Sequence, residues 1–217
     1  LGYQMLNGMP FILVMMAFTT HDAQRALAAG ILYTIHHMLT VGSLILASGA
    51  IEETYGTGRL NKLSGLARRD PIIAWIFAAG AFSVVGFPPF SGMWGKVLIV
   101  AEIARTGGGW AWTVIAVIII ASFAAFLSML RVWRRVFWGK DLPKEKVPKE
   151  LVIRKKLMAP SAALILGSLT MFLLSGPLIE VTMGASADLL DTEAYSHAVL
   201  GDEPVALPDI DSIQEGR

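Results

Sequence analysis

The chain has 217 residues, of which 54% are hydrophobic and only 16% are charged, and its mean hydropathy is +0.59. This composition excludes an ordinary soluble domain and is typical of a polytopic membrane protein. The sequence contains no cysteine, which excludes disulfides, thiolate metal sites and thiol chemistry. The net charge of +1 is uninformative, because the charges are segregated along the chain.

Five hydrophobic segments predict an all-α fold: a polytopic transmembrane helix bundle with about five spanning helices, one of them discontinuous. Those predicted to span the membrane as single helices have the roughly 20 apolar residues that this requires. The segments cover residues 1–18, 26–51, 71–104, 110–138 and 157–179. We therefore expect a transmembrane bundle over residues 1–180 and a polar, acidic tail over residues 181–217.

The first segment has no basic start and no small-residue cleavage signal, so it does not resemble a signal peptide. It is slightly short for a spanning helix, and the chain begins with Leu1 rather than methionine. We expect the chain to be a fragment of a longer protein, cut near the start of a membrane helix. The short loop that follows places Thr20 or Asp22 where either could cap the next helix.

Polar side chains lie in the middle of the second segment. His36, Thr40 and Ser43 follow i, i+4, i+7 spacing and share one helix face, while Tyr33 and His37 form an i, i+4 pair beside it. Histidine exchanges a proton readily near neutral pH, so the group indicates a proton path or a hydrated cavity. A hydrogen-bonded helix-packing site is the alternative. A metal site is not expected, because adjacent histidines point about 100° apart on a helix.

A lysine lies inside the third segment, beside a predicted helix break. Pro88 and Pro89, followed by Gly92 and Gly95, interrupt the helix just before Lys96. Charges at bilayer depth are costly and usually functional, and broken helices are tolerated where they line a polar cavity. Lys96 is therefore a candidate ion or proton site, with snorkelling to an interface as the alternative.

Lys96 has no acidic neighbour one helical turn away. Glu102 is six residues further on and lies on a different face of the helix. We expect the counter-charge of Lys96 to come from another helix or another protein of the same complex.

Basic residues and tryptophans predict the orientation. If every segment crosses once, most basic residues share one side, which the positive-inside rule makes cytoplasmic, and the acidic tail lies outside. Tryptophans bracket the fourth segment as interfacial anchors: Trp110, Trp112, Trp133 and Trp138. The basic side contains Arg59, Lys62, Arg68, Arg69, Arg131, Arg134, Arg135, Lys140, Lys144, Lys146, Lys149, Arg154, Lys155 and Lys156, and the other side only Arg25, Arg105 and Arg217. Topology and anionic lipid headgroups explain the basic stretch 140–156 better than nucleic acid does.

The sequence lacks the motifs of covalent catalysis. We find no glycine-rich phosphate loop after a strand, no nucleophile elbow and no paired acid cluster. No cofactor, metal or nucleic-acid partner is therefore expected.

Three stretches carry a family resemblance: residues 1–6 (LGYQML), 28–37 (AAGILYTIHH) and 86–96 (GFPPFSGMWGK). Together they resemble the proton-pumping, antiporter-like membrane subunits shared by Mrp-type Na⁺/H⁺ antiporters and respiratory complex I. The match covers about residues 1–180. Residues 189–200 also resemble the ending of the D-type branch of that family, with Ser196 in place of the usual isoleucine.

The resemblance implies a function and partners. Lys96 would be the terminal lysine of a proton path, with His36 and His37 in its central hydrophilic axis. The family's other essential residues, a glutamate and a lysine, would lie on earlier helices outside this chain. Implied partners are other membrane subunits of an antiporter complex, the lipid bilayer, H⁺ and Na⁺. A membrane-arm subunit of a quinone-reducing respiratory enzyme and a non-conducting scaffold remain alternatives.

Overall fold

The computed structural model describes residues 2–140 and 151–201, and every regular element in these two ranges is helical. The all-α prediction is confirmed. The elements are α1 (Gly2–Ala17), α2 (Ala23–Tyr55), α3 (Leu66–Arg69), α4 (Pro71–Val85), α5 (Gly92–Thr106), α6 (Gly108–Val132), a π-helical turn η1 (Trp133–Phe137), α7 (Lys155–Leu173), α8 (Ser175–Leu190) and α9 (Thr192–Leu200).

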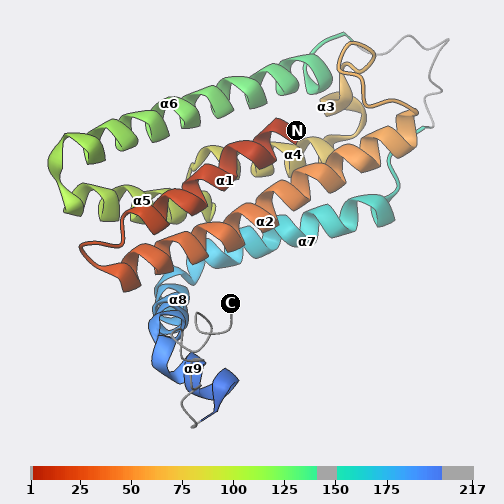
Figure 1. The fold of residues 1–217 in the computed structure, drawn as a ribbon. Helices are drawn as coiled ribbons and strands as arrows, with labels where there is room; N and C mark the ends of the chain where they lie inside the picture. The colour runs from red at the N-terminus through yellow and green to blue at the C-terminus, as the bar shows by residue number, and fades with distance from the viewer. Residues whose placement is uncertain (1, 141–150, 202–217) are drawn as a thin grey trace, which may run out of the picture.

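Helix α2 is the centre of the bundle. It packs against α1, α4, α5, α7 and α8 and runs along the length of the molecule (Figure 1). The side chain of Asp22 accepts a hydrogen bond from the backbone N–H of Arg25 at 3.0 Å, so Asp22 is the N-cap of this helix. With 33 residues α2 is about 50 Å long, more than the roughly 30 Å of a bilayer core.

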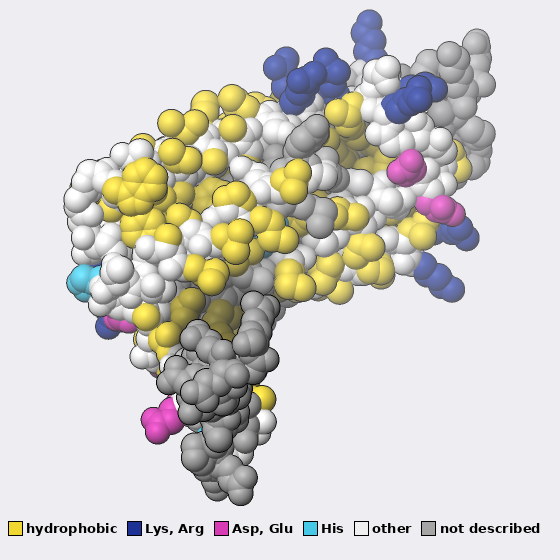
Figure 2. Space-filling model, in the orientation of Figure 1, with side chains coloured by type: hydrophobic (Ala, Val, Ile, Leu, Met, Phe, Trp, Pro, Cys, Tyr) yellow, Lys and Arg dark blue, Asp and Glu magenta, His cyan; other side chains and the backbone are white. Residues whose placement is uncertain are grey.

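Length and composition make three of the described helices long enough to cross a membrane: α2, α6 with η1, and α7. The apolar helices α1 and α4 are shorter, and α4 and α5 have 15 residues each. Large apolar side chains such as Met38, Ile120 and Phe123 point outward and are more than 60% exposed. Figure 2 shows hydrophobic side chains over the body of the molecule and most visible Lys and Arg side chains at one end. These features belong to a multi-pass membrane protein.

The last predicted segment, 157–179, differs from the structure. Two helices replace it, because α7 ends at Leu173 and α8 leaves at an angle to α7 while still packing against α2 (Figure 1). Pro177 has no N–H to bond the carbonyl of Leu173, so the first helix cannot continue without losing a hydrogen bond. The predicted boundary at residue 180 between bundle and tail therefore falls inside α8, and residues 202–217 of the tail lie outside the described residues.

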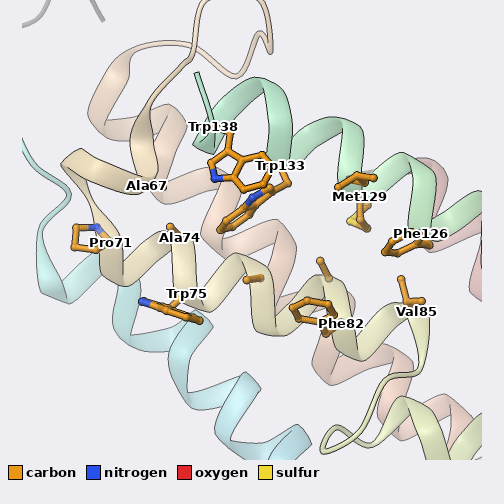
Figure 3. Close-up of a pocket in the computed structure, with 13 residues that line it drawn as sticks. Ala67, Pro71, Ala74, Trp75, Phe82, Val85, Phe126, Met129, Trp133 and Trp138 are labelled. Carbon is orange, nitrogen blue, oxygen red and sulfur yellow. The ribbon is translucent and has the colours of Figure 1, made fainter. Parts of the chain in front are cut away.

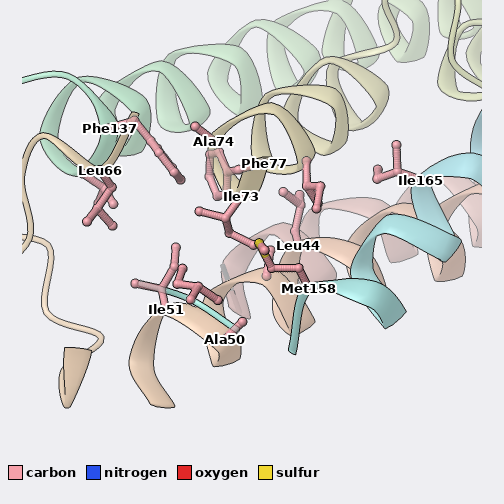
Figure 4. Close-up of a cluster of buried hydrophobic side chains, with 14 of the residues drawn as sticks. Leu44, Ala50, Ile51, Leu66, Ile73, Ala74, Phe77, Phe137, Met158 and Ile165 are labelled. Carbon is pink, nitrogen blue, oxygen red and sulfur yellow. The ribbon is translucent and has the colours of Figure 1, made fainter. Parts of the chain in front are cut away.

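An apolar cluster holds one end of the bundle together (Figure 4). Leu44 of α2 and Phe77 of α4 are each 1% exposed, and the Phe77 ring lies 4.8 Å from the ring of Phe137 in η1. Ile165 of α7 closes the cluster. Helices α2, α4, η1 and α7 thus share one core.

A buried carboxylate joins this core to the loops beside it. Asp70, 6% exposed, accepts hydrogen bonds from the hydroxyl of Tyr55 and, at 2.9 Å, from the backbone N–H of Ile153. It thereby ties the end of α2 to the start of α4 and to the chain entering α7. The sequence reasoning gave Asp70 no role.

Candidate functional site

The chain between α4 and α5 leaves the helical path. Helix α4 ends at Val85 and α5 begins at Gly92, with Pro88 and Pro89 between them, joined by a cis peptide bond. The two half-helices pack against each other and against α2. The structure therefore places irregular backbone within the bundle, where neighbouring helices can satisfy its polar groups.

Two glycines let α5 approach its neighbours. A Cβ atom at Gly92 would collide with the backbone carbonyl of Ser83 and would lie 2.9 Å from Cε1 of His36. A Cβ atom at Gly95 would lie 2.9 Å from Cδ2 of Tyr33. Any side chain at these positions would push α5 away from α2 and α4.

Lys96 lies beside the break, and its amine points to the end of α4. Nζ donates hydrogen bonds to the carbonyls of Val84 at 3.0 Å and Val85 at 2.7 Å, and to the hydroxyl of Ser122 in α6 at 3.0 Å. The last carbonyls of a helix carry the negative end of its dipole, so they attract a cation. The broken helix α4 thus supplies the partial negative charge that faces Lys96.

No carboxylate of the described residues contacts the amine of Lys96. Glu102 instead pairs with Arg105 at 2.7 Å, within its own helix. The amine also lies 5.7 Å from the ring centroid of Phe11, which is within cation–π range. Lys96 is only partly buried, so its surroundings combine backbone carbonyls, one hydroxyl and one aromatic face.

His36 is buried in a group of hydroxyls. Its Nδ1 atom lies 2.8 Å from Oγ of Ser91 and 3.3 Å from Oγ1 of Thr40. Thr40 contacts Ser83 at 3.0 Å, and Ser168 of α7 lies 2.9 Å from Ser83 and 2.8 Å from Ser91. The structure thus brings His36 and Thr40 together with three serines from α4, α7 and the break.

Tyr33 and His37 lie next to this group. The ring of Tyr33 is 5.4 Å from the ring of His36 and stacks on His37 at 6.1 Å, between centroids. Both side chains are buried, and a Cβ atom at Gly8 of α1 would collide with the His37 ring. His37 therefore faces α1, whereas His36 faces the break and α7.

Ser43 lies apart from the His36 group. It exchanges hydrogen bonds with Ser161 of α7: the two hydroxyls are 2.9 Å apart, and each also donates to the other residue's carbonyl. This arrangement matches the helix-packing alternative for Ser43 rather than a contact with His36.

Four hydroxyls around Lys96 and His36 escaped the sequence reasoning. They are Ser83, Ser91, Ser122 and Ser168. The only signal in the sequence was a hydroxyl inside an otherwise apolar segment, but serine also packs helices without further function, so the residue type alone does not discriminate.

A separate cavity lies away from these residues. It is an apolar groove of about 520 Å³ between α4 and α6, with Trp75 and Phe82 on one wall and Phe126 and Trp133 on the other (Figure 3). Its lining holds no charged side chain, so it offers nothing to an ion. Nor do the described residues group three His, Asp or Glu side chains that could hold a metal.

Comparison with known proteins decides the family. The profile described as "NADH:quinone oxidoreductase/Mrp antiporter, TM" matches residues 1–128, more than half of the chain. The chain belongs to this family. The match includes α2 with its histidines and both halves of the broken helix.

Individual family members agree with this result. The chain is 34% identical to the D-type subunit of the Na(+)/H(+) antiporter of Bacillus subtilis over 81% of its own length and 34% of that protein. It is 27% identical to the D-type antiporter subunit of Alkalihalophilus pseudofirmus, over 92% of this chain and 39% of that one. A chain in the structure of the Mrp complex from a Dietzia species superposes with a TM-score of 0.77 at 32% identity, covering 89% of this chain and 43% of that chain. The sequence therefore spans about a third to two fifths of these curated relatives.

Proposed function

We propose that this chain is part of a proton-translocating membrane subunit, of the D type, in a multisubunit Na⁺/H⁺ antiporter. Protons would pass through a half-channel that includes Lys96 and His36, with Tyr33, His37 and Thr40 beside them. The remaining charged residues of the path and the other subunits would lie outside this chain. The protein would act as a transporter subunit rather than as a catalytic enzyme.

The single observation that carries the proposal is the setting of Lys96. A primary amine on a broken helix faces two helix-end carbonyls and a hydroxyl, with no carboxylate of the described residues in contact. An ammonium with no carboxylate in contact responds strongly to a charge that arrives nearby, which is what a proton relay requires. The similarity to two D-type antiporter subunits supports the assignment of the transported ions.

We also propose an orientation in a bacterial plasma membrane. By the positive-inside rule, the exposed arginines at the end of α6 and the basic residues before α7 would be cytoplasmic. The gathering of most visible Lys and Arg side chains at one end of the molecule supports a single basic side (Figure 2). The tail after residue 180 would then lie outside the cell. Residues 141–150, which carry Lys144, Lys146 and Lys149, lie outside the described residues.

A second candidate function has one observation in its favour. The matching family profile names NADH:quinone oxidoreductase together with the Mrp antiporter. In that setting the same residues would pump protons with redox energy supplied by other subunits. Neighbouring genes discriminate the two: antiporter subunits for the first, dehydrogenase and iron–sulfur subunits for the second.

Replacement of Lys96 by alanine tests the proposal. In everted membrane vesicles we expect Lys96→Ala to abolish Na⁺-dependent proton movement, followed with a pH-sensitive dye, while the complex still assembles. Lys62→Ala, at an exposed loop lysine, is the matched control and should retain activity. Near-normal antiport in the assembled Lys96→Ala complex would refute the proposal.

A further inference from the structure

The hydroxyls around His36 form a closed ring. Starting from Nδ1 of His36, the contacts run to Ser91 (2.8 Å), Ser168 (2.8 Å), Ser83 (2.9 Å) and Thr40 (3.0 Å), and return to the same Nδ1 at 3.3 Å. All five side chains are at most 3% exposed. The ring therefore begins and ends at one titratable atom and is closed to bulk water by the fold.

The direction of the hydrogen bonds in this ring depends on that atom. An unprotonated Nδ1 has one lone pair to accept with, so the nearer hydroxyl, that of Ser91, can donate to it while Ser168 donates to Ser91. A protonated Nδ1 must donate instead, for example to Ser91, whose own hydrogen then has to turn toward Ser168. A proton at Nδ1, in the neutral ring or in the imidazolium, thus reverses the donors along the serines. Thr40, at the far end, is left to donate to the carbonyl one turn back in its helix, a bond that helical threonines commonly make.

Ser168 is the residue that makes this reversal possible. It is the α7 contact of both Ser83, in the last turn of α4, and Ser91, just before α5. Without its hydroxyl, Ser91 loses the acceptor it needs when Nδ1 donates. A buried hydroxyl left without a partner is unfavourable, so the protonated-Nδ1 form would be disfavoured.

The same serine also holds the break that carries Lys96. Ser83 is followed directly by Val84 and Val85, whose carbonyls accept from the Lys96 amine. Ser168 bonds across the break, from Ser83 on one side to Ser91 on the other. A serine of the His36 ring and the two carbonyls that accept from Lys96 therefore lie in the same turn of α4.

We propose that Ser168 of α7 is a positioning residue of the proton path: it closes the hydroxyl ring that sets whether Nδ1 of His36 accepts or donates a hydrogen bond, and it ties together the two sides of the break that holds Lys96. This inference rests on the proposed function for the meaning of the path. The ring itself rests on the geometry alone. The other ionisable groups near His36 are Tyr33 and His37 of its own helix and Lys96 of α5.

The test is whether Nδ1 of His36 carries a proton in the complete, membrane-embedded protein. Nitrogen-15 NMR on membranes with ¹³C,¹⁵N-labelled histidine separates protonated from unprotonated Nδ1, and His36→Gln assigns the signals by their loss. All spectra are recorded at the same pH. That pH is chosen between about 5 and about 9 so that the wild type shows protonated Nδ1. We expect Ser168→Ala to lose this signal and its antiport rate to fall about tenfold, the effect of one buried hydrogen bond.

Two further variants separate positioning from packing. Ser168→Thr keeps the hydroxyl and should restore the Nδ1 signal. Ser161→Ala removes a serine from the same helix that is equally buried but bonds to Ser43 of α2, outside the ring, and should leave the spectrum unchanged. Ser168→Ala with a wild-type spectrum, Ser161→Ala with the same spectral loss, or a wild type without protonated Nδ1 anywhere in that pH range would each overturn the inference.

The two proposals fail in different ways. Normal antiport in Lys96→Ala, with the Ser168 spectral effect intact, would contradict the proposed function and leave the hydroxyl ring standing. Lost antiport in Lys96→Ala, with spectra insensitive to the Ser168→Ala change, would support the proposed function and contradict the role of Ser168.

Discussion

The two halves of α2 are buried equally and built differently. From Tyr33 to Thr40, called the polar half below, the helix presents a histidine and hydroxyls to the break and to α7. From Leu44 to Ile51, called the apolar half, it presents only small and apolar side chains to the Phe77 cluster. Burying polar groups costs free energy unless each is hydrogen-bonded. Apolar side chains would therefore suffice at these positions if only packing mattered. The comparison teaches that burial alone does not mark a site. The polar half carries function in our proposal, and the apolar half carries stability.

The largest effect should come from the apolar half. Phe77→Ala removes a ring that is 1% exposed and contacts Phe137, which should cost about 3–5 kcal/mol of stability. Thermal unfolding of the purified protein measures this loss. Antiport per assembled complex should stay near the wild-type value, because the ring lies away from the His36 group. Loss of antiport in complexes that assemble normally would erase the division between the halves.

A glycine at the break comes next. Gly92→Ala places a methyl group against the carbonyl of Ser83 and the ring of His36, so α5 must shift, at a cost of about 1–3 kcal/mol. We expect antiport to be lost although most of the protein still folds. Gly49→Ala in α2 is the control, since a Cβ atom there meets nothing within 4 Å. If Gly92→Ala retained full antiport, the close approach of α5 would have no functional meaning.

The smallest effect should come from the serine pair between the halves. Ser161→Ala removes hydrogen bonds to Ser43 and should cost about 0.6 kcal/mol, the average measured for hydrogen bonds between membrane helices. Unfolding of the variant in detergent gives the value, and antiport should be unchanged. A large loss of antiport would move Ser43 and Ser161 into the proton path.

Local signals made part of this molecule predictable. Thr20 and Asp22 before an apolar run predicted the start of α2, where Asp22 proves to be the cap, and Pro88 with Pro89 predicted the break. Both signals are local, because capping and the missing proline N–H act within a few residues. The turn between α7 and α8 was missed although Gly176 and Pro177 mark it, since hydropathy continues across it.

The surroundings of the two candidate residues were not predictable. Helix periodicity correctly showed that Lys96 has no acidic neighbour in its own helix, but its acceptors are backbone carbonyls, which periodicity does not place. Ser168 lies 77 residues from Ser91 in the chain, and only the packing of α7 against the break brings them together. Contacts of this range depend on tertiary structure rather than on local pattern.

The most direct measurement is antiport by a His36→Gln variant in the assembled complex. Glutamine can still hydrogen-bond to Ser91, so packing is preserved, but it cannot take up a proton at neutral pH. We expect Na⁺-dependent proton movement in everted vesicles to be lost, with assembly and thermal unfolding close to the wild type. Near-normal antiport would show that His36 only packs the bundle and would contradict a proton path through the polar half of α2.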